Sequence, residues 1–313
     1  MTATTTRTMH SDLHRRRIIW GWLFLSPWIV GFLLLYLVPM ISSLVFSFTN
    51  FDLSRPNEIE FVGLRNWQAL FADPNVGASL VNTFLYGLVA LPLSVIIPIG
   101  VAALLNDQRL WGKQIVRTLF YLPFIVPTVA SAFIWAGFLN AESGWLNRAL
   151  ALVGITAPNW LYDPQVIYPG LFFVSLWGIG NAVLITLAGM QTVPTELYEA
   201  ARVDGASPWT LFRKITLPMI SPVIFYNLVL TTIALFRFFD VPFMLKGSGG
   251  NPAGTTLFYN IYLYRVAFPQ QNMGYGSTLA WLLFVIALVV TIALFLWSRR
   301  WVYYASGEVE SSH

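Results

Sequence analysis

The stretch EAARVDGASPWTLFRKITLP runs from Glu199 to Pro218 and carries five charged residues, in a chain that is 57% hydrophobic and only 10% charged. Gly205 divides it, because glycine readily adopts the left-handed conformation that ends a helix. Ser207 and Pro208 follow as an N-cap and a first-turn proline, so a second helix is expected to begin there. The stretch therefore predicts two short helices joined by a glycine turn and lying outside the membrane.

The two faces of this expected helix pair differ in chemistry. We expect Thr195 to cap the first helix, and Leu217 with Pro218 to end the second, because proline cannot continue a helix. The apolar faces consist of Leu197, Ala200, Ala201, Trp209, Phe212 and Ile215. The charged face consists of Glu199, Arg202 and Asp204. A solvated connector and a docking surface for a partner are both compatible with this pattern. Capped helices with exposed apolar groups favour docking.

The rest of the chain is too apolar for a soluble domain. It has 313 residues and a mean hydropathy of +0.65, whereas a soluble domain is about a quarter charged. Six uncharged runs exceed the roughly 18 residues that suggest a spanning helix. The sequence therefore predicts an all-α polytopic membrane protein with six transmembrane helices. They are expected near residues 19–41, 80–105, 116–139, 167–189, 219–243 and 277–298.

The distribution of Lys and Arg sets the expected orientation. Twelve of them lie in the segments on one side of the expected spans and five on the other, and the positive-inside rule puts the richer side in the cytoplasm. Both termini are then cytoplasmic, as segments 1–18 and 299–313, and residues 190–218 form a cytoplasmic loop of the membrane domain 19–298. The basic start and long first apolar run are interpreted as a retained helix rather than a cleaved signal peptide.

Several kinds of chemistry find no support in the residues. The chain has no Cys and therefore no disulfide. His10, His14 and His313 all lie near the termini, which argues against a buried His-based metal site. The segment GGNPAGTT resembles a phosphate-binding loop, but Thr255 stands where that motif needs Lys. We expect no metal, cofactor, nucleotide site or nucleic-acid partner for this chain.

The opening stretch also carries a family resemblance. Its spacing E-A-A-x3-G-x9-I-x-L-P resembles the cytoplasmic loop of permease subunits of bacterial ABC importers. Other segments are similar to the carbohydrate-uptake branch of that family, the maltose and glycerol-phosphate type, and together cover nearly the whole chain. These segments are LSPWIVGFLLLYLVPM, FVGLRNW, RTLFYLPFIVPTVASAFIW, GGNPAGTTLFYNIYLYRVAF and MGYGSTLAW. The Gly-rich loop resembles the first permease of the usual unlike pair.

The resemblance implies a partner for the opening stretch. In the family this loop forms a coupling helix in a cleft of an ATPase subunit, where its Glu pairs with a basic group; Glu199 matches that Glu and Gly205 the turn glycine. The implied complex contains a second permease, two ATPases that use ATP and Mg²⁺, and an extracytoplasmic sugar-binding protein at the bacterial inner membrane. The chain itself is not expected to be an enzyme. The expected coupling residues are Glu199, Ala200, Ala201, Asp204, Gly205, Ile215, Leu217 and Pro218.

Candidates for the sugar pathway lie in the fourth and fifth expected spans. Matching the maltose-type family by distance from Glu199 implies that Gly178 and Asn181 lie at the substrate cavity. Arg237 and Asp240 are three residues apart and are expected to share a helix face. Structural alternatives remain open, namely helix packing for the glycines, an interhelical hydrogen bond for the asparagines and an ion pair near the interface for the charges. The candidates are Trp177, Gly178, Asn181, Asn227, Phe236, Arg237 and Asp240.

The predicted function is import of a sugar, delivered by a binding protein, through an ATP-driven permease. The alternative, an ion-coupled secondary sugar transporter, would favour a midplane acidic residue and inverted repeats. A membrane enzyme would need a cluster of Asp, Glu or His at one membrane face. Neither pattern is evident in the sequence, and nothing in it names the sugar.

Overall fold

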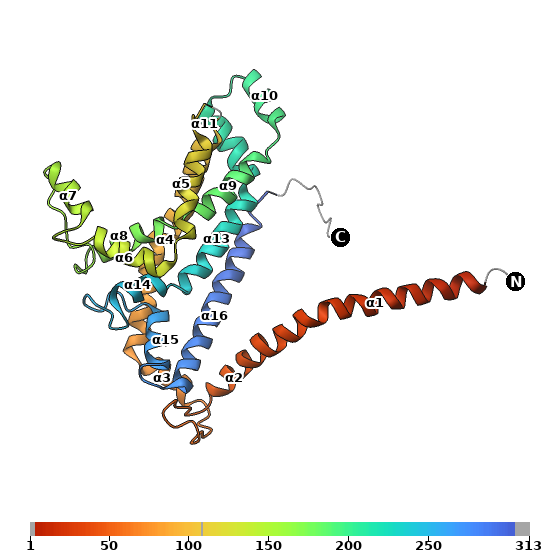
Figure 1. The fold of residues 1–313 in the computed structure, drawn as a ribbon, viewed down its shortest axis with the longest axis vertical. Helices are drawn as coiled ribbons and strands as arrows, with labels where there is room; N and C mark the ends of the chain where they lie inside the picture. Colours follow the sequence, from red (N-terminus) through yellow and green to blue (C-terminus); the bar gives the residue numbers. More distant parts are fainter. Residues whose placement is uncertain (1–3, 108, 304–313) are drawn as a thin grey trace. The chain divides into compact units, whose positions relative to one another are not determined.

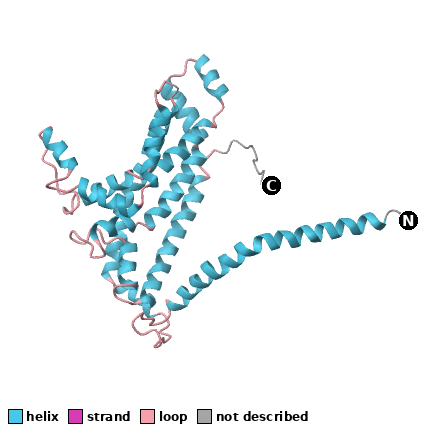
Figure 2. Ribbon diagram, viewed as in Figure 1, coloured by secondary structure: helices cyan, strands magenta, loops and turns pink. Residues whose placement is uncertain are grey.

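A computed structural model describes residues 4–107 and 109–303 of the chain. Every regular element in this part is a helix, drawn in cyan in Figure 2, apart from two isolated β-bridges. The predicted all-α class is confirmed. The elements, labelled where there is room in Figure 1, are α1 (Thr4–Phe32), η1 (Leu33–Leu37), α2 (Val38–Phe46), α3 (Arg65–Ala72), α4 (Pro74–Asn106), α5 (Lys113–Ile125), α6 (Thr128–Phe138), α7 (Trp145–Leu152), α8 (Ile167–Leu176), α9 (Gly180–Gln191), α10 (Thr195–Val203), α11 (Pro208–Leu211), η2 (Phe212–Thr216), α12 (Leu217–Met219), α13 (Ser221–Phe236), α14 (Asp240–Lys246), α15 (Tyr259–Ala267) and α16 (Met273–Ser298).

Four helical segments are long and apolar enough to cross a membrane. They are Arg15–Phe46, Pro74–Asn106, Ser221–Lys246 and Met273–Ser298. Two bent pairs qualify if each pair counts as one span: α5 with α6, bent by 104°, and α8 with α9, bent by 55°. Each of the six expected spans coincides with one of these segments or pairs, so residues 4–107 and 109–303 contain four to six candidate spans by length and composition.

The third expected span, near 116–139, is bent, because α5 ends at Ile125 and α6 begins at Thr128. Pro127 accounts for the break, since the residue before a proline is pushed out of the helical conformation. Val126 accordingly has an extended backbone, with ψ of 128°.

The chain folds as two compact units, each with its own contacts. In the first unit, Asn66 holds the loop after α2 by donating from Nδ2 to the carbonyls of Ser47 (3.1 Å) and Thr49 (2.8 Å). Thr278 donates to the same Ser47 carbonyl at 3.2 Å, so three segments of this unit meet at one place. The units comprise Met1–Leu70 with Val266–Trp281, and Phe71–Arg265 with Leu282–His313.

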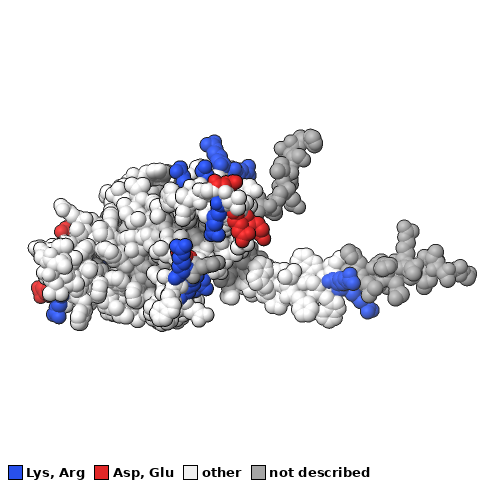
Figure 3. All heavy atoms as spheres, turned by 90° about the horizontal axis from the view of Figure 1, so that it is seen from above, with Lys and Arg blue, Asp and Glu red and all other residues white. Residues whose placement is uncertain are grey.

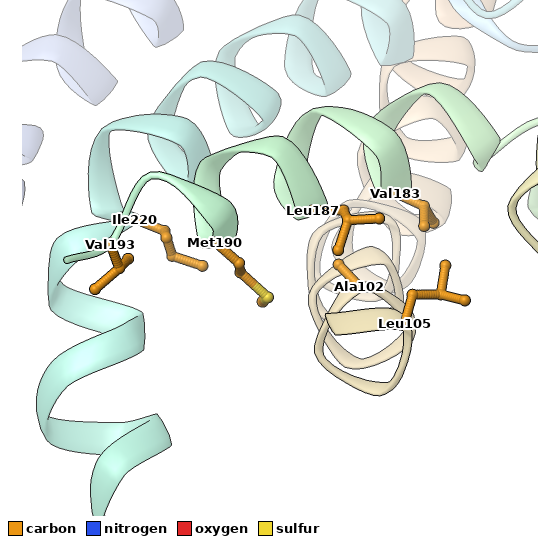
Figure 4. Close-up of a cluster of buried hydrophobic side chains, with 7 residues drawn as sticks. All are labelled: Ala102, Leu105, Val183, Leu187, Met190, Val193 and Ile220. Carbon is orange, nitrogen blue, oxygen red and sulfur yellow. The ribbon is translucent and has the colours of Figure 1, made fainter. Parts of the chain in front are cut away.

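Helix α4 is the central element of the second unit, where it packs against α5, α8, α9 and α13. Figure 4 shows the side chains of Val183 and Leu187 in α9 directed toward Ala102 and Leu105 in α4. None of these four exposes more than 2% of its surface. Inside a membrane such contacts stabilise through close packing rather than through release of water. The buried cluster consists of Ala102, Leu105, Val183, Leu187, Met190, Val193 and Ile220.

Asp73 begins α4 and ties it to α15. One carboxylate oxygen of Asp73 accepts a hydrogen bond from the backbone N–H of Asn75 at 2.9 Å, which caps the helix. The other oxygen accepts a hydrogen bond from the Tyr262 hydroxyl. Burial, and then the bond to Asp73, raises the pKa of Tyr262, so the hydroxyl keeps its proton and continues to donate in neutral solution.

The loop between α14 and α15 is anchored through its own carbonyl oxygens. Asn82 of α4 donates from Nδ2 to the carbonyls of Gly254 (2.8 Å) and Leu257 (3.1 Å). The Tyr168 hydroxyl of α8 lies 3.2 Å from both the Thr255 carbonyl and the Asn82 Oδ1. This is the Gly-rich segment that resembles a phosphate loop, and here it presents carbonyls rather than N–H groups to its neighbours.

We predict that Leu105→Ala lowers the free energy of unfolding by about 2–4 kcal/mol, because it removes buried contacts and leaves a cavity. Leu104→Ala is the matched control, since Leu104 is the adjacent residue of the same helix and exposes 69% of its surface, whereas Leu105 exposes 1%. Thermal unfolding of the purified transporter in detergent measures both. Equal losses in the two variants would show that the cluster does not stabilise the fold.

Candidate functional site: a charged helix pair and two interrupted spans

Helix α10 ends in the glycine turn that the sequence predicts. Gly205 has a φ of +77°, and its N–H donates to the carbonyl of Arg202 at 3.0 Å. The next N–H reaches the carbonyl of Ala201 at 2.9 Å, which completes a Schellman motif. The expected cap at the other end is wrong, because Thr195 is the first helical residue and Pro194 occupies the N-cap position without a side-chain hydrogen bond.

The second helix begins as predicted but continues past its expected end. Ser207 caps α11 by accepting a hydrogen bond from the N–H of Thr210 at 3.3 Å. The predicted end at Leu217 and Pro218 is one residue early, since the chain continues through η2 into α12, which ends at Met219. The π-helix η2 explains this, because the Leu217 N–H donates to the Phe212 carbonyl five residues back and the wider turn accommodates the proline.

The inner edge of the helix pair is attached to the buried cluster. Tyr198 of α10 and Thr216 of η2 share a hydrogen bond of 2.9 Å between their hydroxyl oxygens. Ile215 and Leu217 pack against the cluster, together with Tyr198. A displacement of the helix pair therefore acts directly on α4 and α9. The other predicted coupling residues are exposed or half-buried, namely Glu199, Ala200, Ala201, Asp204, Gly205 and Pro218.

The outer surface of the helix pair mixes charges with large apolar side chains. Glu199 and Asp204 are exposed, while Val203 exposes 88% of its surface and Trp209 exposes 66%. Figure 3 views the molecule from the end that carries α10 and α11, and charged side chains gather over that end. Exposed apolar groups rimmed by charges mark protein-interaction surfaces. Val203 is missing from the predicted apolar face, although it is the most exposed large apolar residue of the pair.

Span four is interrupted at its predicted pathway residues. Trp177 and Gly178 lie between α8 and α9, and the N–H groups of residues 177–179 bond three residues back, at 3.2–3.3 Å, instead of four. Asn181 is exposed in the first turn of α9. Trp177 exposes 41% of its surface and meets Trp135 of α6 edge-on, with ring centroids 5.8 Å apart.

The two glycines of this segment have different surroundings. A Cβ added to Gly180 would collide with the carbonyl of Phe120, so glycine is required where α9 approaches the backbone of α5. A Cβ added to Gly178 would have only the Ser175 carbonyl within 4 Å, at 3.7 Å. Helix packing, the structural alternative left open for the glycines, is therefore seen at Gly180 and not at Gly178.

Span five is interrupted as well. Helix α13 ends at Phe236 and α14 begins at Asp240, so the prediction that Arg237 and Asp240 share one helix face is wrong. Both charged residues are exposed. Phe236 is buried, and its ring meets Phe84 of α4 edge-on at 5.8 Å. Pro242 in the first turn of α14 is the sequence signal for this break, because a proline there could not donate to the Phe238 carbonyl of a continuous helix.

Tyr86 of α4 contacts both interruptions. Its ring stacks on Phe238 with centroids 4.8 Å apart and planes 6° apart, and its hydroxyl lies 3.0 Å from the Ser175 Oγ. Phe258, just before α15, meets both rings edge-on at 5.4 and 5.2 Å. One buried side chain of the central helix thus fixes both interrupted spans. Tyr86 is not among the predicted site residues, because one more aromatic residue in an apolar helix carries no distinguishing signal.

Asn227 makes an interhelical hydrogen bond, which is the structural alternative that the sequence left open for it. It exposes 6% of its surface and donates from Nδ2 to the Thr186 Oγ1 of α9 at 3.0 Å. This hydrogen bond joins α13 to α9, and interhelical bonds of this kind stabilise membrane bundles by about 0.6–2 kcal/mol.

Two surface cavities lie away from the candidate pathway residues. One, of about 480 Å³, is lined by residues around α7, including Glu142 and Arg148. The other, of about 570 Å³, lies at the start of α5. The described residues contain no group of three His, Asp or Glu that could hold a metal ion.

Residues 94–304 match the protein family described as the binding-protein-dependent transport system inner membrane component. The chain belongs to this family. It is 39% identical over 291 residues to the probable ABC transporter permease protein YesP of Bacillus subtilis, covering 92% of this chain and 93% of that one. It is 32% identical over 286 residues to the trehalose/maltose transport system permease protein MalF of Thermococcus litoralis, covering 90% and 94%.

The fold of the permease is also known from a solved structure. A crystal structure of a bacterial ABC transporter involved in the import of the acidic polysaccharide alginate superposes with a TM-score of 0.79 at 24% identity, covering 94% of this chain and 99% of that one. The resemblance to ABC importer permeases is thus confirmed. The chain is a multi-pass inner-membrane permease subunit and is not itself an ATPase.

We predict that Gly180→Ala sharply reduces the yield of folded permease, because its Cβ would displace the α5 backbone at Phe120. Gly178→Ala is the matched control two residues away, where the added methyl group has room. Membrane insertion and size-exclusion profiles of the detergent-extracted protein measure the difference. Normal yield of both variants would contradict the close approach of α9 to α5.

Proposed function

We propose that the permease imports a sugar delivered by an extracytoplasmic binding protein, driven by two ATPase subunits that use ATP and Mg²⁺. A second, related permease would complete the membrane part, with the Lys- and Arg-rich side and both termini in the cytoplasm. The observation that carries the proposal is the helix pair α10–α11, with its charged and apolar outer surface and its inner edge attached to α4 and α9. The sugar as cargo rests on the trehalose/maltose relative.

The outer surface of the helix pair is the proposed contact with an ATPase subunit. Glu199 would pair with a basic group there, while Val203 and Trp209 supply apolar area that is otherwise left in water. Ala200 and Ala201 have small side chains, which allows the ATPase subunit to approach the backbone of α10 closely. The glycine turn at Gly205 fixes the angle between the two helices, because no other residue adopts its φ of +77° as readily.

The inner edge would pass ATPase movement into the spans. The Tyr198–Thr216 hydrogen bond makes α10 and η2 move together, and Ile215 and Leu217 contact the cluster shared by α4 and α9. Closure of the ATPases would therefore shift the inner ends of α4 and α9. Tyr86, farther along α4, connects that shift to the two interruptions in spans four and five.

The two interruptions are the proposed wall of the sugar pathway. Irregular backbone at membrane depth is tolerated where it is covered by protein or lines an aqueous cavity. Asn181 offers an amide to sugar hydroxyls, and the Trp177 ring offers a face to the sugar carbons. Arg237 and Asp240 flank the second interruption and are exposed in the single chain. The second permease would supply the opposite wall.

We predict that Glu199→Lys abolishes co-purification of the ATPase subunits and ATP-dependent uptake, because it reverses the charge offered to the partner. The variant should still insert into the membrane. Glu142→Lys is the matched control, an equally exposed carboxylate in the loop before α7. Pull-down from detergent extracts and uptake of labelled maltose or trehalose in proteoliposomes measure the effects. Uptake by the permeases without any ATPase would instead support an ion-coupled transporter.

We predict that Asn181→Ala changes the preference between maltose and trehalose while leaving thermal stability nearly unchanged, because Asn181 is exposed at an interruption. Asn227→Ala should do the reverse and lower stability by about 1 kcal/mol through loss of the bond to Thr186. Competition assays in proteoliposomes and thermal unfolding separate the two. An unaltered sugar profile for Asn181→Ala would remove it from the pathway.

A further inference from the structure

The residues after α16 contact the beginning of α13. The N–H groups of Trp301 and Val302 both donate to the Ser298 carbonyl, at 3.1 and 2.9 Å, which forms one further turn at the end of the helix. The N–H of Tyr303 then donates to the Ser221 Oγ at 2.8 Å. Residues 299–303 are called the C-terminal strap below.

Ser221 joins the strap to the segment that carries the helix pair. It exposes 2% of its surface, and its hydroxyl donates to the Pro218 carbonyl of α12 at 2.6 Å while accepting from Tyr303. A serine hydroxyl has one proton and two lone pairs, so both bonds form at once. One buried oxygen therefore connects α12, α13 and the strap.

Aromatic contacts hold the strap along the same side of α13. Phe225, one turn beyond Ser221, exposes 6% of its surface and meets the Trp301 ring edge-on at 6.2 Å. Phe225 also meets Phe295 of α16 edge-on at 5.0 Å, and Trp301 packs on Trp297 at 5.3 Å. Edge-to-face pairs of this kind stabilise a contact beyond the area they bury.

The junction that the strap contacts is intrinsically weak. Pro218 and Pro222 flank it, and neither has an N–H to donate to the helix, so two backbone hydrogen bonds are missing within one turn. Ile220 lies between α12 and α13 with φ of −91° and ψ of 6°, outside the helical range. A helix interrupted in this way bends easily. Force applied to α10–α12 would then be absorbed at Ile220 instead of reaching α13.

We infer that Ser221 and Trp301 are positioning residues for coupling: through them the strap stiffens the junction at Ile220, so that movement of the helix pair reaches α13 and α16 together. The inference rests on the proposed docking of the helix pair on an ATPase. It gives the end of span six a part in transport, beyond that of a membrane anchor. Neither residue contacts the proposed sugar pathway or the proposed docking surface.

The test uses the complete transporter, with both permeases, the ATPases and the binding protein, in proteoliposomes. Ser221→Ala should keep the ATPase subunits bound and ATP hydrolysis running, but lower the labelled maltose or trehalose transported per ATP by about threefold to tenfold. Ser298→Ala is the matched control. Ser298 is buried as well, and its hydroxyl bonds the carbonyl three residues back, within one helix, at 2.8 Å. It should transport at the wild-type ratio.

A second pair of variants tests the aromatic contact. Trp301→Ala should lower the transport-to-ATP ratio, and Trp301→Phe should restore it. The indole Nε1 is buried without a hydrogen-bond partner in the described structure, so phenylalanine forfeits no bond there. These variants keep the inference testable if Ser221→Ala does not fold.

The outcomes separate this inference from the proposed function. If Glu199→Lys retains the ATPases and normal uptake, the docking proposal fails and the inference fails with it. If Glu199→Lys loses both while Ser221→Ala and Trp301→Ala transport at the ratio of Ser298→Ala, docking stands and the positioning role of the strap is refuted. A reduced ratio with ATPases still bound, rescued by Trp301→Phe, supports the strap.

Discussion

The Tyr86 ring stacks on Phe238, and its hydroxyl bonds to Ser175, at the two points where spans four and five are broken. Backbone groups freed by a helix break have no water to turn to within a bilayer, and an unpaired group there costs several kcal/mol. Spans four and five are nevertheless broken. Three-residue turns pair the backbone N–H groups of residues 177–179, the Asn260 Nδ2 of α15 donates to the Arg237 carbonyl, and the Tyr86 side chain of α4 packs against both broken segments. The role of α4 as the central helix and its contact with both interruptions are two aspects of one packing arrangement.

The helix pair has a different requirement, since its outer surface must stay exposed while its inner edge stays attached to the buried cluster. Glycine and proline residues contribute to this in different ways. Gly205 permits the sharp reversal, and η2 lets the chain pass Pro218 without stopping. The result is a continuous path of helical residues from the exposed surface to the start of α13, interrupted only at Ile220. The strap acts at that one interruption, which is why a segment far along the chain bears on the same movement.

Short-range signals in the sequence were sufficient for the local features. Gly205, Ser207 and Pro208 each act within three or four residues, so the turn and the second cap are readable, and long uncharged runs locate the spans. The prediction of Thr195 as the N-cap of α10 is wrong because Pro194 occupies that position. The break between Arg237 and Asp240 has its signal in Pro242, which lies beyond the break. Tyr86 becomes distinctive only through partners about 90 and 150 residues away in the chain. Such contacts depend on how α4 packs, which no local pattern contains. The passage of the chain through Pro218 likewise depends on a wider helical turn that the residue alone does not specify.

In the loop between α14 and α15, carbonyl oxygens accept the hydrogen bonds from Asn82 and Tyr168, and the buried Phe258 side chain packs at the end of the loop. Every amino acid brings the same carbonyl, so replacing a side chain at Thr255 or Leu257 leaves the acceptor of the anchoring bond in place. The shape of this loop is thereby separated from the chemical character of the surface it displays. Substitutions at exposed positions of this loop can therefore change the surface that it displays while these hydrogen bonds to the bundle stay the same.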